Sequence, residues 1–146
     1  MRAGSGERGS MTVEVAFLLV LLVVPLFYLV GTVGRLQAGA YAVTAAAREA
    51  GRAFVTAEDV SSAPARAQVA AGLVYRAHGF DPQDGGVQLS CAEAGCLTPG
   101  GSVRVDSQVS VELPLVPDFM RERLPTAVTL TASHLETVDE FRTGAP

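Results

Sequence analysis

The feature that most constrains this chain is an uncharged run of nineteen residues, Val15–Val33, which reads VAFLLVLLVVPLFYLVGTV. As a helix with a rise of about 1.5 Å per residue it reaches roughly 28 Å, close to the ~30 Å hydrocarbon core of a bilayer. Fourteen of the nineteen residues are Leu, Val or Phe, which together favour insertion by on the order of 4 to 8 kcal/mol. We therefore predict a membrane-spanning helix, kinked rather than broken at Pro25.

This run divides the chain into four segments. Residues 1–14 form a Gly- and Ser-rich tail that we do not expect to fold, and residues 15–34 form the membrane helix. Residues 35–80 are predicted to be an exported helical segment and residues 81–146 an exported antiparallel β region. The part from residue 35 onward holds nine arginines and thirteen carboxylates, so the net charge of −4 lies there. An acidic chain of this kind is a poor candidate for nucleic-acid binding.

The membrane helix is expected to continue beyond the bilayer as one rod to about Thr56. In this stretch small apolar residues recur at a spacing of four and three, which indicates one narrow helical stripe: Leu36, Ala40, Val43, Ala47, Ala50 and Phe54. The alanine-rich stripe fits either packing in the domain core or a helix–helix interface, and the sequence leaves both open.

A second helix is predicted from about Pro64 to Ala77, with serines near its start, Gly79 just past its end and His78 at its C-terminal cap. From Asp81 onward the pattern changes to turn residues and to a period of two. The clearest strand runs from Ser102 to Leu113, with its valines on one side and polar residues on the other.

Three further β and helical features complete the predicted domain. A short strand is expected over residues 87–91, and another over residues 127–138 that is interrupted near His134 by a bulge or an end, with His134 on the solvent side. One helical turn is expected over residues 118–124. The fold class is therefore α+β: a long membrane-spanning helix continues into a small domain with a short helix and three or four antiparallel strands.

The two cysteines, Cys91 and Cys96, flank four residues that include Gly95. A tight loop of this size can bring the two side chains within bonding distance, so we predict a disulfide that stabilises the domain by about 2 kcal/mol. A zinc site would need two more ligands, which the neighbouring sequence does not supply. A disulfide implies an oxidising compartment and favours export of the C-terminal domain, whereas the arginines on the two sides of the membrane helix do not decide its orientation.

The sequence contains no familiar catalytic or cofactor-binding motif. It lacks a nucleophile elbow, a phosphate-binding glycine loop and a zinc-protease motif, and its exported carboxylates are scattered. We therefore predict a protein that is not an enzyme and binds no cofactor or metal. An exported hydrolase would require a pocket that joins His78 or His134 to carboxylates.

The most specific short motif precedes the apolar run: Arg8-Gly9-Ser10-Met11-Thr12-Val13-Glu14. If the chain were cut after Gly9, the new ammonium group of Ser10 would lie one helical turn before Glu14. An unpaired carboxylate at the membrane edge and a cation at a helix N-terminus are each unfavourable, and the two groups would offset these costs by pairing. As a lone glutamate, Glu14 would be explained as well by a place in the headgroup region.

This motif resembles the prepilin-peptidase site of type IV pilins and pseudopilins. More narrowly, ERGSMTVEVAFLLVLLVVPLFYLV followed by GRLQAGAYAVTAAAREAGRA is similar to the TadE-like minor pseudopilins of tight-adherence (Flp-type) pilus systems. The resemblance covers residues 7–56 and implies processing residues Gly9, Ser10 and Glu14, with cleavage between Gly9 and Ser10. Ser10 departs from the apolar first mature residue common in pilins, and Val15 favours the minor over the major class.

The resemblance also implies a function and partners. The chain would be a non-enzymatic, single-pass protein of the cytoplasmic membrane with an extracytoplasmic C-terminal domain, taking part in pilus assembly. Its partners would be the lipid bilayer, other pilins or pseudopilins, pilus assembly proteins and a prepilin peptidase.

A different export route gives the alternative function. Ala38-Gly39-Ala40 matches a signal-peptidase site, and cleavage there would release a secreted binding module that begins at Tyr41. An uncut helix would instead tether such a module to the surface. Against a signal peptide stand the length of the apolar run and the position of Glu14.

Overall fold

The computed structural model describes residues 7–91, 95–113 and 126–142, with side chains from Met11 onward. Two helices precede three strands along the chain, in the order α1 (Glu7–Val55), α2 (Ala63–Ala77), β1 (Gly85–Cys91), β2 (Ser102–Glu112) and β3 (Ala127–Thr137). The predicted α+β class, with a long apolar helix, a short helix and an antiparallel sheet, is therefore correct. The helical turn expected over residues 118–124 lies outside the described residues.

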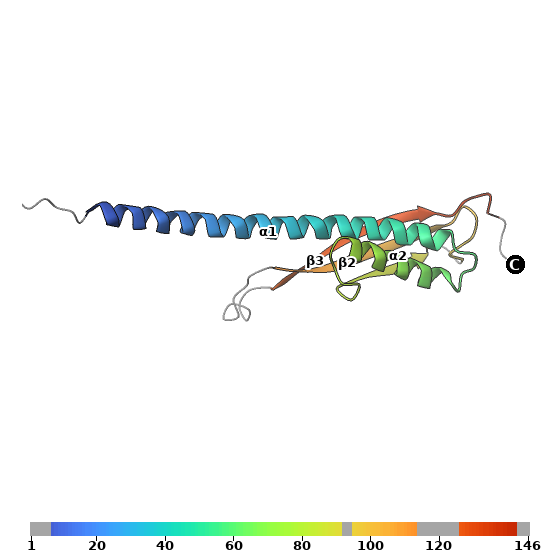
Figure 1. Ribbon diagram of the computed structural model, residues 1–146. Coiled ribbons are helices and arrows are strands. Elements are labelled where there is room, and N and C mark those ends of the chain that lie inside the picture. The colour runs from blue at the N-terminus through green and yellow to red at the C-terminus, as the bar shows by residue number, and fades with distance from the viewer. Residues whose placement is uncertain (1–6, 92–94, 114–125, 143–146) are drawn as a thin grey trace, which may run out of the picture.

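Helix α1 is a single element of 49 residues that runs through Pro25 without interruption. At 1.5 Å per residue it is roughly 73 Å long, and Figure 1 shows that only its C-terminal half lies against the rest of the domain. The predicted continuous rod is confirmed, and it ends one residue before Thr56. The helix also begins at Glu7, so the second half of the tail that we expected to remain unfolded is helical.

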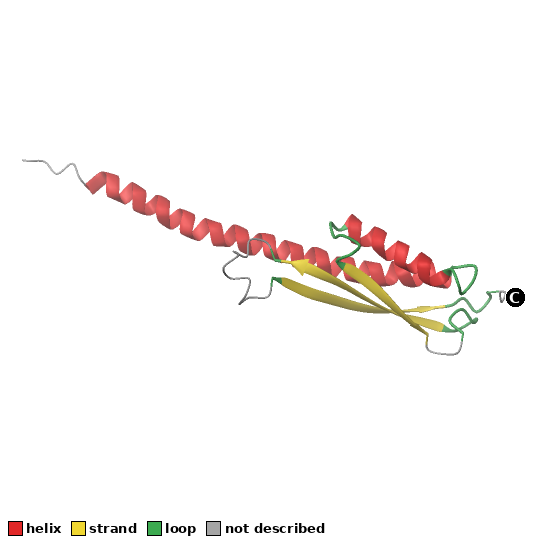
Figure 2. Ribbon diagram, turned by 90° about the horizontal axis from the view of Figure 1, so that it is seen from below, coloured by secondary structure: helices red, strands yellow, loops and turns green. Residues whose placement is uncertain are grey.

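The sheet is antiparallel with β2 in the centre and β1 and β3 at its edges. Helices α1 and α2 lie side by side over one face of this sheet, as both views show (Figures 1 and 2). Helix α1 contacts β2 and β3, and α2 contacts β1. The alternation predicted for β2 is confirmed, since its valines are buried beneath the helices: Val103, Val105, Val109 and Val111.

The buried face of α1 is wider than the predicted stripe. Ala40, which we placed on the stripe, is exposed, whereas Gly39, Ala42, Ala46 and Gly51 are buried. A spacing of four and three describes contact along one seam, but α1 packs against both α2 and the sheet. Contact with two neighbours therefore buries a broader set of positions than contact with one.

Helix α2 begins one residue before its predicted start. Ser62 occupies the N-cap position without a side-chain cap. Instead, the Asp59 carboxylate accepts hydrogen bonds from the Ser62 backbone N–H at 2.8 Å and from the hydroxyls of Ser61 and Ser62. These bonds, the one from the Ser61 hydroxyl foremost, lower the pKa of Asp59 below its ordinary value of 3.8.

The C-terminal end of α2 is capped as the sequence predicted. The His78 ring donates from Nδ1 to the Val74 carbonyl at 3.0 Å. Gly79 follows with φ of 79°, a left-handed conformation that favours glycine at this position. His78 therefore serves the end of a helix.

A buried polar contact joins α2 to the sheet, and the sequence analysis did not predict it. The Tyr75 hydroxyl lies 2.7 Å from Ser107 Oγ, and it is 3.0 Å from the Gly86 carbonyl and 3.2 Å from the Gln108 carbonyl. Both side chains are almost fully buried. Burial raises the pKa of Tyr75, so the phenol stays protonated and can donate. Because buried polar groups must be paired, this contact fixes α2 against one position of β2.

Strand β3 differs from the prediction at His134. Its register with β2 is unbroken from Ser102↔Thr137 to Glu112↔Ala127, so there is neither a bulge nor an end at His134. His134 pairs with the buried Val105 and is half-buried on the helix-covered face, not on the solvent side. The apolar pattern slips here because β3 is an edge strand that α1 covers only in part. The backbone of α1 is close, since a Cβ on Gly51 would lie 3.1 Å from the Glu136 Cβ, yet the side chains of His134 and Glu136 remain about one third exposed.

Candidate functional site

The predicted processing residues lie in the first turns of α1. Gly9, Ser10 and Glu14 all belong to this helix, and the Glu14 side chain is exposed. Residues four apart on a helix are neighbours on one face, so the backbone of Ser10 stands one turn before Glu14, as the motif requires. The side chain of Ser10 lies outside the described part of the chain.

The bond between Gly9 and Ser10 lies inside the helix, two residues after its first residue. A peptidase acts on backbone that has opened, and terminal helical turns open at a free-energy cost near zero. This segment therefore can become accessible without disturbing the folded domain, which begins to pack some thirty residues later.

The most apolar part of α1 is not buried against the rest of the described chain. By length and composition it can cross a membrane: its most apolar window has a mean hydropathy of 2.7, and none of that window is buried. Large side chains such as Phe17, Leu22 and Phe27 are more than 60% exposed. Because surfaces this apolar are costly in water, this half of the helix requires an apolar environment.

Arg35 joins α1 to the domain just after the apolar run. Its guanidinium lies over the Phe80 ring, 4.9 Å from the ring centroid, and Nη1 lies 3.4 Å from the Gly79 carbonyl. Phe80 itself is buried. From the sequence, Arg35 counts only as a charge near the predicted membrane helix, because its contact with residues 79 and 80 depends on how α2 folds back along α1.

The other end of α1 is held by Arg142. Its guanidinium donates from Nη1 to the Val55 carbonyl at 2.6 Å, and from Nη2 to the carbonyls of Ala57 and Glu58. The last carbonyls of a helix lack partners within the helix, so Arg142 supplies partners to this corner of the chain. Sequence reasoning missed this contact because 87 residues separate Arg142 from Val55.

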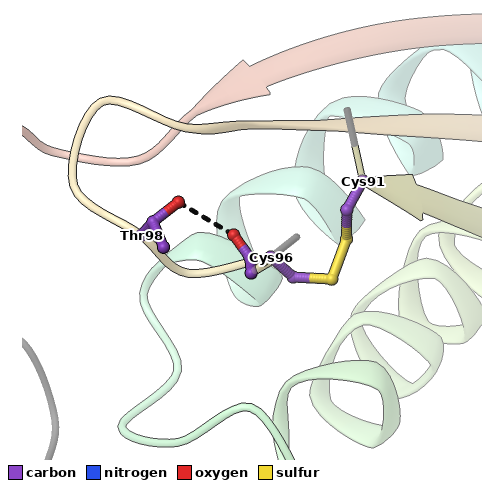
Figure 3. The surroundings of a disulfide bond; sticks show 4 residues. Cys91, Cys96 and Thr98 are labelled. Carbon is purple, nitrogen blue, oxygen red and sulfur yellow. Dashed lines mark hydrogen bonds between the residues drawn. A yellow bond between two sulfur atoms is a disulfide. The ribbon is translucent and has the colours of Figure 1, made fainter. Parts of the chain in front are cut away.

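The disulfide predicted between Cys91 and Cys96 is present (Figure 3). It joins the end of β1 to the connection that leads to β2, with the two Cα atoms 5.2 Å apart. Within the same connection, the Thr98 hydroxyl donates to the Gly95 carbonyl at 2.9 Å. Gly95 has φ of 130°, so the turn that closes the pair uses a conformation that side chains disfavour.

Each histidine contacts a group of its own helix or strand. His134 Nε2 lies 3.0 Å from Glu136 Oε2 within one strand, and His78 faces a backbone carbonyl. A shallow hollow on the outer face of the sheet is lined by other residues, mostly polar ones: Gln88, Arg104, Asp106, Ser107, Gln108, Thr131, Ala132 and Ser133. Within the described ranges, no group of three or more His, Cys, Asp or Glu residues is placed to hold a metal ion.

Comparisons with protein-family models, with curated proteins and with solved structures found no match for this chain.

Proposed function

We propose that this chain is a membrane-anchored minor pseudopilin of the TadE-like kind, which takes part in tight-adherence pilus assembly and catalyses no reaction. One observation carries the proposal. A single uninterrupted helix has an apolar, unpacked N-terminal half and a C-terminal half packed into a small α+β domain. This is the arrangement that a subunit needs if it is to stand in a bilayer and present a domain beside it.

The two ends of the packed half make the chain a stiff unit. Arg35 and Arg142 hold α1 to the domain at the membrane side and at the far end respectively. A force or displacement applied to the membrane helix would thus be passed to the domain. Such stiffness suits a subunit that is moved or packed as one piece during assembly.

Glu14 would act near the N-terminus of the assembled subunit. In the membrane interface its carboxylate needs a positive partner. The ammonium group that cleavage after Gly9 would create on Ser10, in this chain or in a neighbouring subunit, is such a partner. Glu14 would then set how deeply this helix lies in the membrane relative to the helix of the neighbouring subunit.

The disulfide supports export of the domain. Bonds between cysteines persist in oxidising compartments and are rare in the cytosol. The proposed topology therefore places residues 1–14 in the cytoplasm and the domain outside the cytoplasmic membrane.

The alternative is a secreted or surface-tethered binding module. Release by signal peptidase after Ala40 would remove Gly39, whose Cα packs so closely that a Cβ there would lie 2.6 Å from Val111 Cγ2. The cut would fall within packed helix rather than in a linker, which weighs against release. A tethered module with an uncut helix has the same architecture as the pseudopilin and differs from it in its partners.

Mass spectrometry of the protein extracted from membranes, with and without a co-expressed prepilin peptidase, tests the proposal. We expect an N-terminus at Ser10 only with the peptidase, and retention of Met1 in a Gly9→Leu variant. An N-terminus at Tyr41 would establish secretion instead, and Met1 in every sample would leave an uncut anchor.

A topology measurement completes the test. In intact spheroplasts, protease added from outside should digest the domain, and a thiol reagent applied without reductant should label neither Cys91 nor Cys96. Recovery of the full-length chain in the soluble cytosolic fraction would refute the assignment.

A further inference from the structure

The outer surface of the two helices, on the side away from the sheet, carries an apolar groove. A groove between α1 and α2 is lined by Ala53, Ala65, Arg66, Val69, Ala70 and Leu73. Val69 is 64% and Leu73 is 58% exposed. These residues recur at intervals of four along α2, so they form a stripe that runs parallel to the helix. We call this surface the helical groove.

Helix α2 has no polar face of the usual kind. Its sequence, APARAQVAAGLVYRA, contains only three strongly polar residues, Arg66, Gln68 and Arg76, and no carboxylate. One side of α2 is buried against the domain, and it consists of Ala63, Ala67, Ala71 and Tyr75. A helix that is apolar on both sides is normally buried on both sides. This indicates that another molecule covers the helical groove when the protein functions.

The charges of the domain are separated between its layers. From residue 35 to residue 77 the two helices carry five exposed arginines and one glutamate: Arg35, Arg48, Arg52, Arg66, Arg76 and Glu49. The remaining described residues after Val55 carry nine carboxylates and two arginines. The helical groove thus lies in a positively charged layer of an otherwise acidic protein.

This separation argues against a second copy of the chain as the occupant. Two copies that met groove to groove would bring their arginine-rich layers together, and like charges across an interface are repulsive. The outer face of the sheet is a poor match as well. It offers one large exposed apolar residue, Leu135, and the carboxylate of Asp106 there is already engaged by Arg104 Nε at 3.2 Å.

We propose that the helical groove binds a helix of a different protein, with an apolar stripe flanked by carboxylates. Helix α2 lies alongside α1 in both views (Figures 1 and 2), so the groove runs along the same rod that spans the proposed membrane. A partner helix that leaves the bilayer beside α1 can continue into the groove. The path of the partner out of the bilayer beside α1 rests on the proposed function. The charge and the apolar lining of the groove are observed independently of that function.

Two synthetic helices test the chemistry directly. Each has about 20 residues, long enough to be helical, with leucines at every third and fourth position. One peptide carries glutamates beside the leucines and the other carries lysines at the same places. Binding is measured by fluorescence anisotropy to the full-length protein in nanodiscs of uncharged phosphatidylcholine.

We expect the glutamate peptide to bind about tenfold more tightly than the lysine peptide at low salt, which corresponds to a few exposed ion pairs. Leu73→Gln should weaken its binding severalfold. Leu135→Gln is the matched control, because Leu135 is 59% exposed on the sheet, and it should have no effect. Reversal of charge in an Arg66→Glu, Arg76→Glu double variant should make the lysine peptide the tighter ligand.

Three outcomes would overturn the proposal. These are equal binding of the two peptides, equal weakening by Leu73→Gln and Leu135→Gln, and efficient formation of disulfide-linked dimers by a Leu73→Cys variant, which would make a second copy the occupant. None of them bears on whether the chain is cleaved at Gly9 or inserted in a membrane. Failure of this inference and failure of the proposed function are therefore distinguishable.

Discussion

Both halves of α1 present an apolar surface, yet the two surfaces are built from different residues. The N-terminal half consists mainly of Leu, Val and Phe, and its side chains are exposed, while the C-terminal half buries Ala and Gly against α2 and the sheet. Large side chains suit an environment that adapts to them, such as lipid. Small side chains suit close approach to a fixed neighbour, because the backbone of one element then meets the side chains of another. Side-chain size therefore separates the half that is suited to a membrane, called the membrane half below, from the packed half of one helix.

The largest expected effect comes from charges placed in the membrane half. A Val20→Arg, Leu22→Arg double variant adds roughly 5 to 7 kcal/mol to the cost of insertion, at about 2.5–3.5 kcal/mol for each arginine. This offsets most of the favourable term, so we expect the protein to be lost from carbonate-washed membranes. Thr44→Arg, at an exposed position of the packed half, should leave membrane association unchanged. Equal loss with both variants would end the distinction between the halves.

Glycine replacement tests the same comparison through size. A Cβ on Gly39 would lie 2.6 Å from Val111 Cγ2 and 2.9 Å from Leu130 Cδ1, whereas a Cβ on Gly31 would meet nothing within 4 Å. Gly39→Val should therefore destabilise the domain by about 2–3 kcal/mol through overpacking, and Gly31→Val should not. Urea unfolding of the detergent-solubilised protein, followed by protease sensitivity of the domain, measures the difference. A fully stable Gly39→Val variant would mean that α1 packs less closely than described.

Removal of the buried hydroxyl of α2 should have a smaller effect. Tyr75→Phe leaves Ser107 Oγ without its phenol partner and removes the one O–H that can donate to the Gly86 or the Gln108 carbonyl, which should cost about 1–2 kcal/mol. Tyr41→Phe is the control, because Tyr41 is 71% exposed on α1. The same urea titration should show a lower midpoint for the first variant only. Identical midpoints would indicate that the Tyr75 contact adds nothing to stability.

The smallest effect concerns the corner where α1 ends. The pKa of Asp59 is lowered in the folded protein by hydrogen bonds from Ser61 and Ser62, so its contribution to stability is present above the unfolded value, near 3.8, and is lost as the pH falls through the folded value. We expect Asp59→Ala to lower the Tm slightly at pH 7 and the gap from wild type to shrink below about pH 4.

Glu58→Ala, at the neighbouring exposed carboxylate, is the control for the loss of one negative charge at the end of α1. A gap between Asp59→Ala and wild type that stayed constant down to pH 2 would show that the ionised carboxylate of Asp59 is not what stabilises the corner.

Apart from the tail, where α1 begins at Glu7 instead of after residue 14, the main disagreements between sequence and structure lie where several elements meet. The stripe on α1 was predicted too narrow, and Ala40 was wrongly included, because the sequence does not show that two elements would pack on the helix. His134 was placed on the wrong side for a similar reason. The pattern of apolar residues ended there, but pairing with β2 continued, and the half-covered edge beside α1 accepts a polar pair.

The site was predictable in its local parts only. Residues 9, 10 and 14 lie within one turn or so of each other, so their helical arrangement follows from their spacing. The disulfide between Cys91 and Cys96 also follows from spacing, because the two residues are five positions apart. The contacts of Arg35 and Arg142 that hold α1 to the domain could not be predicted in this way, since each arginine contacts residues more than forty positions away in the sequence.

By itself the sequence determined the elements of this protein: the uncharged run that makes a helix long and apolar enough to span a membrane, its continuation to about residue 55, the second helix with its glycine stop, the central valine strand and the cysteine pair. Each depends on residues close together in the chain, where periodicity, propensity and loop size act directly. Only the tertiary structure decided which faces those elements share. It buried Gly39 and Ser107, turned His134 inward and left Val69 and Leu73 uncovered, because packing depends on the shapes of neighbours that the sequence does not place side by side.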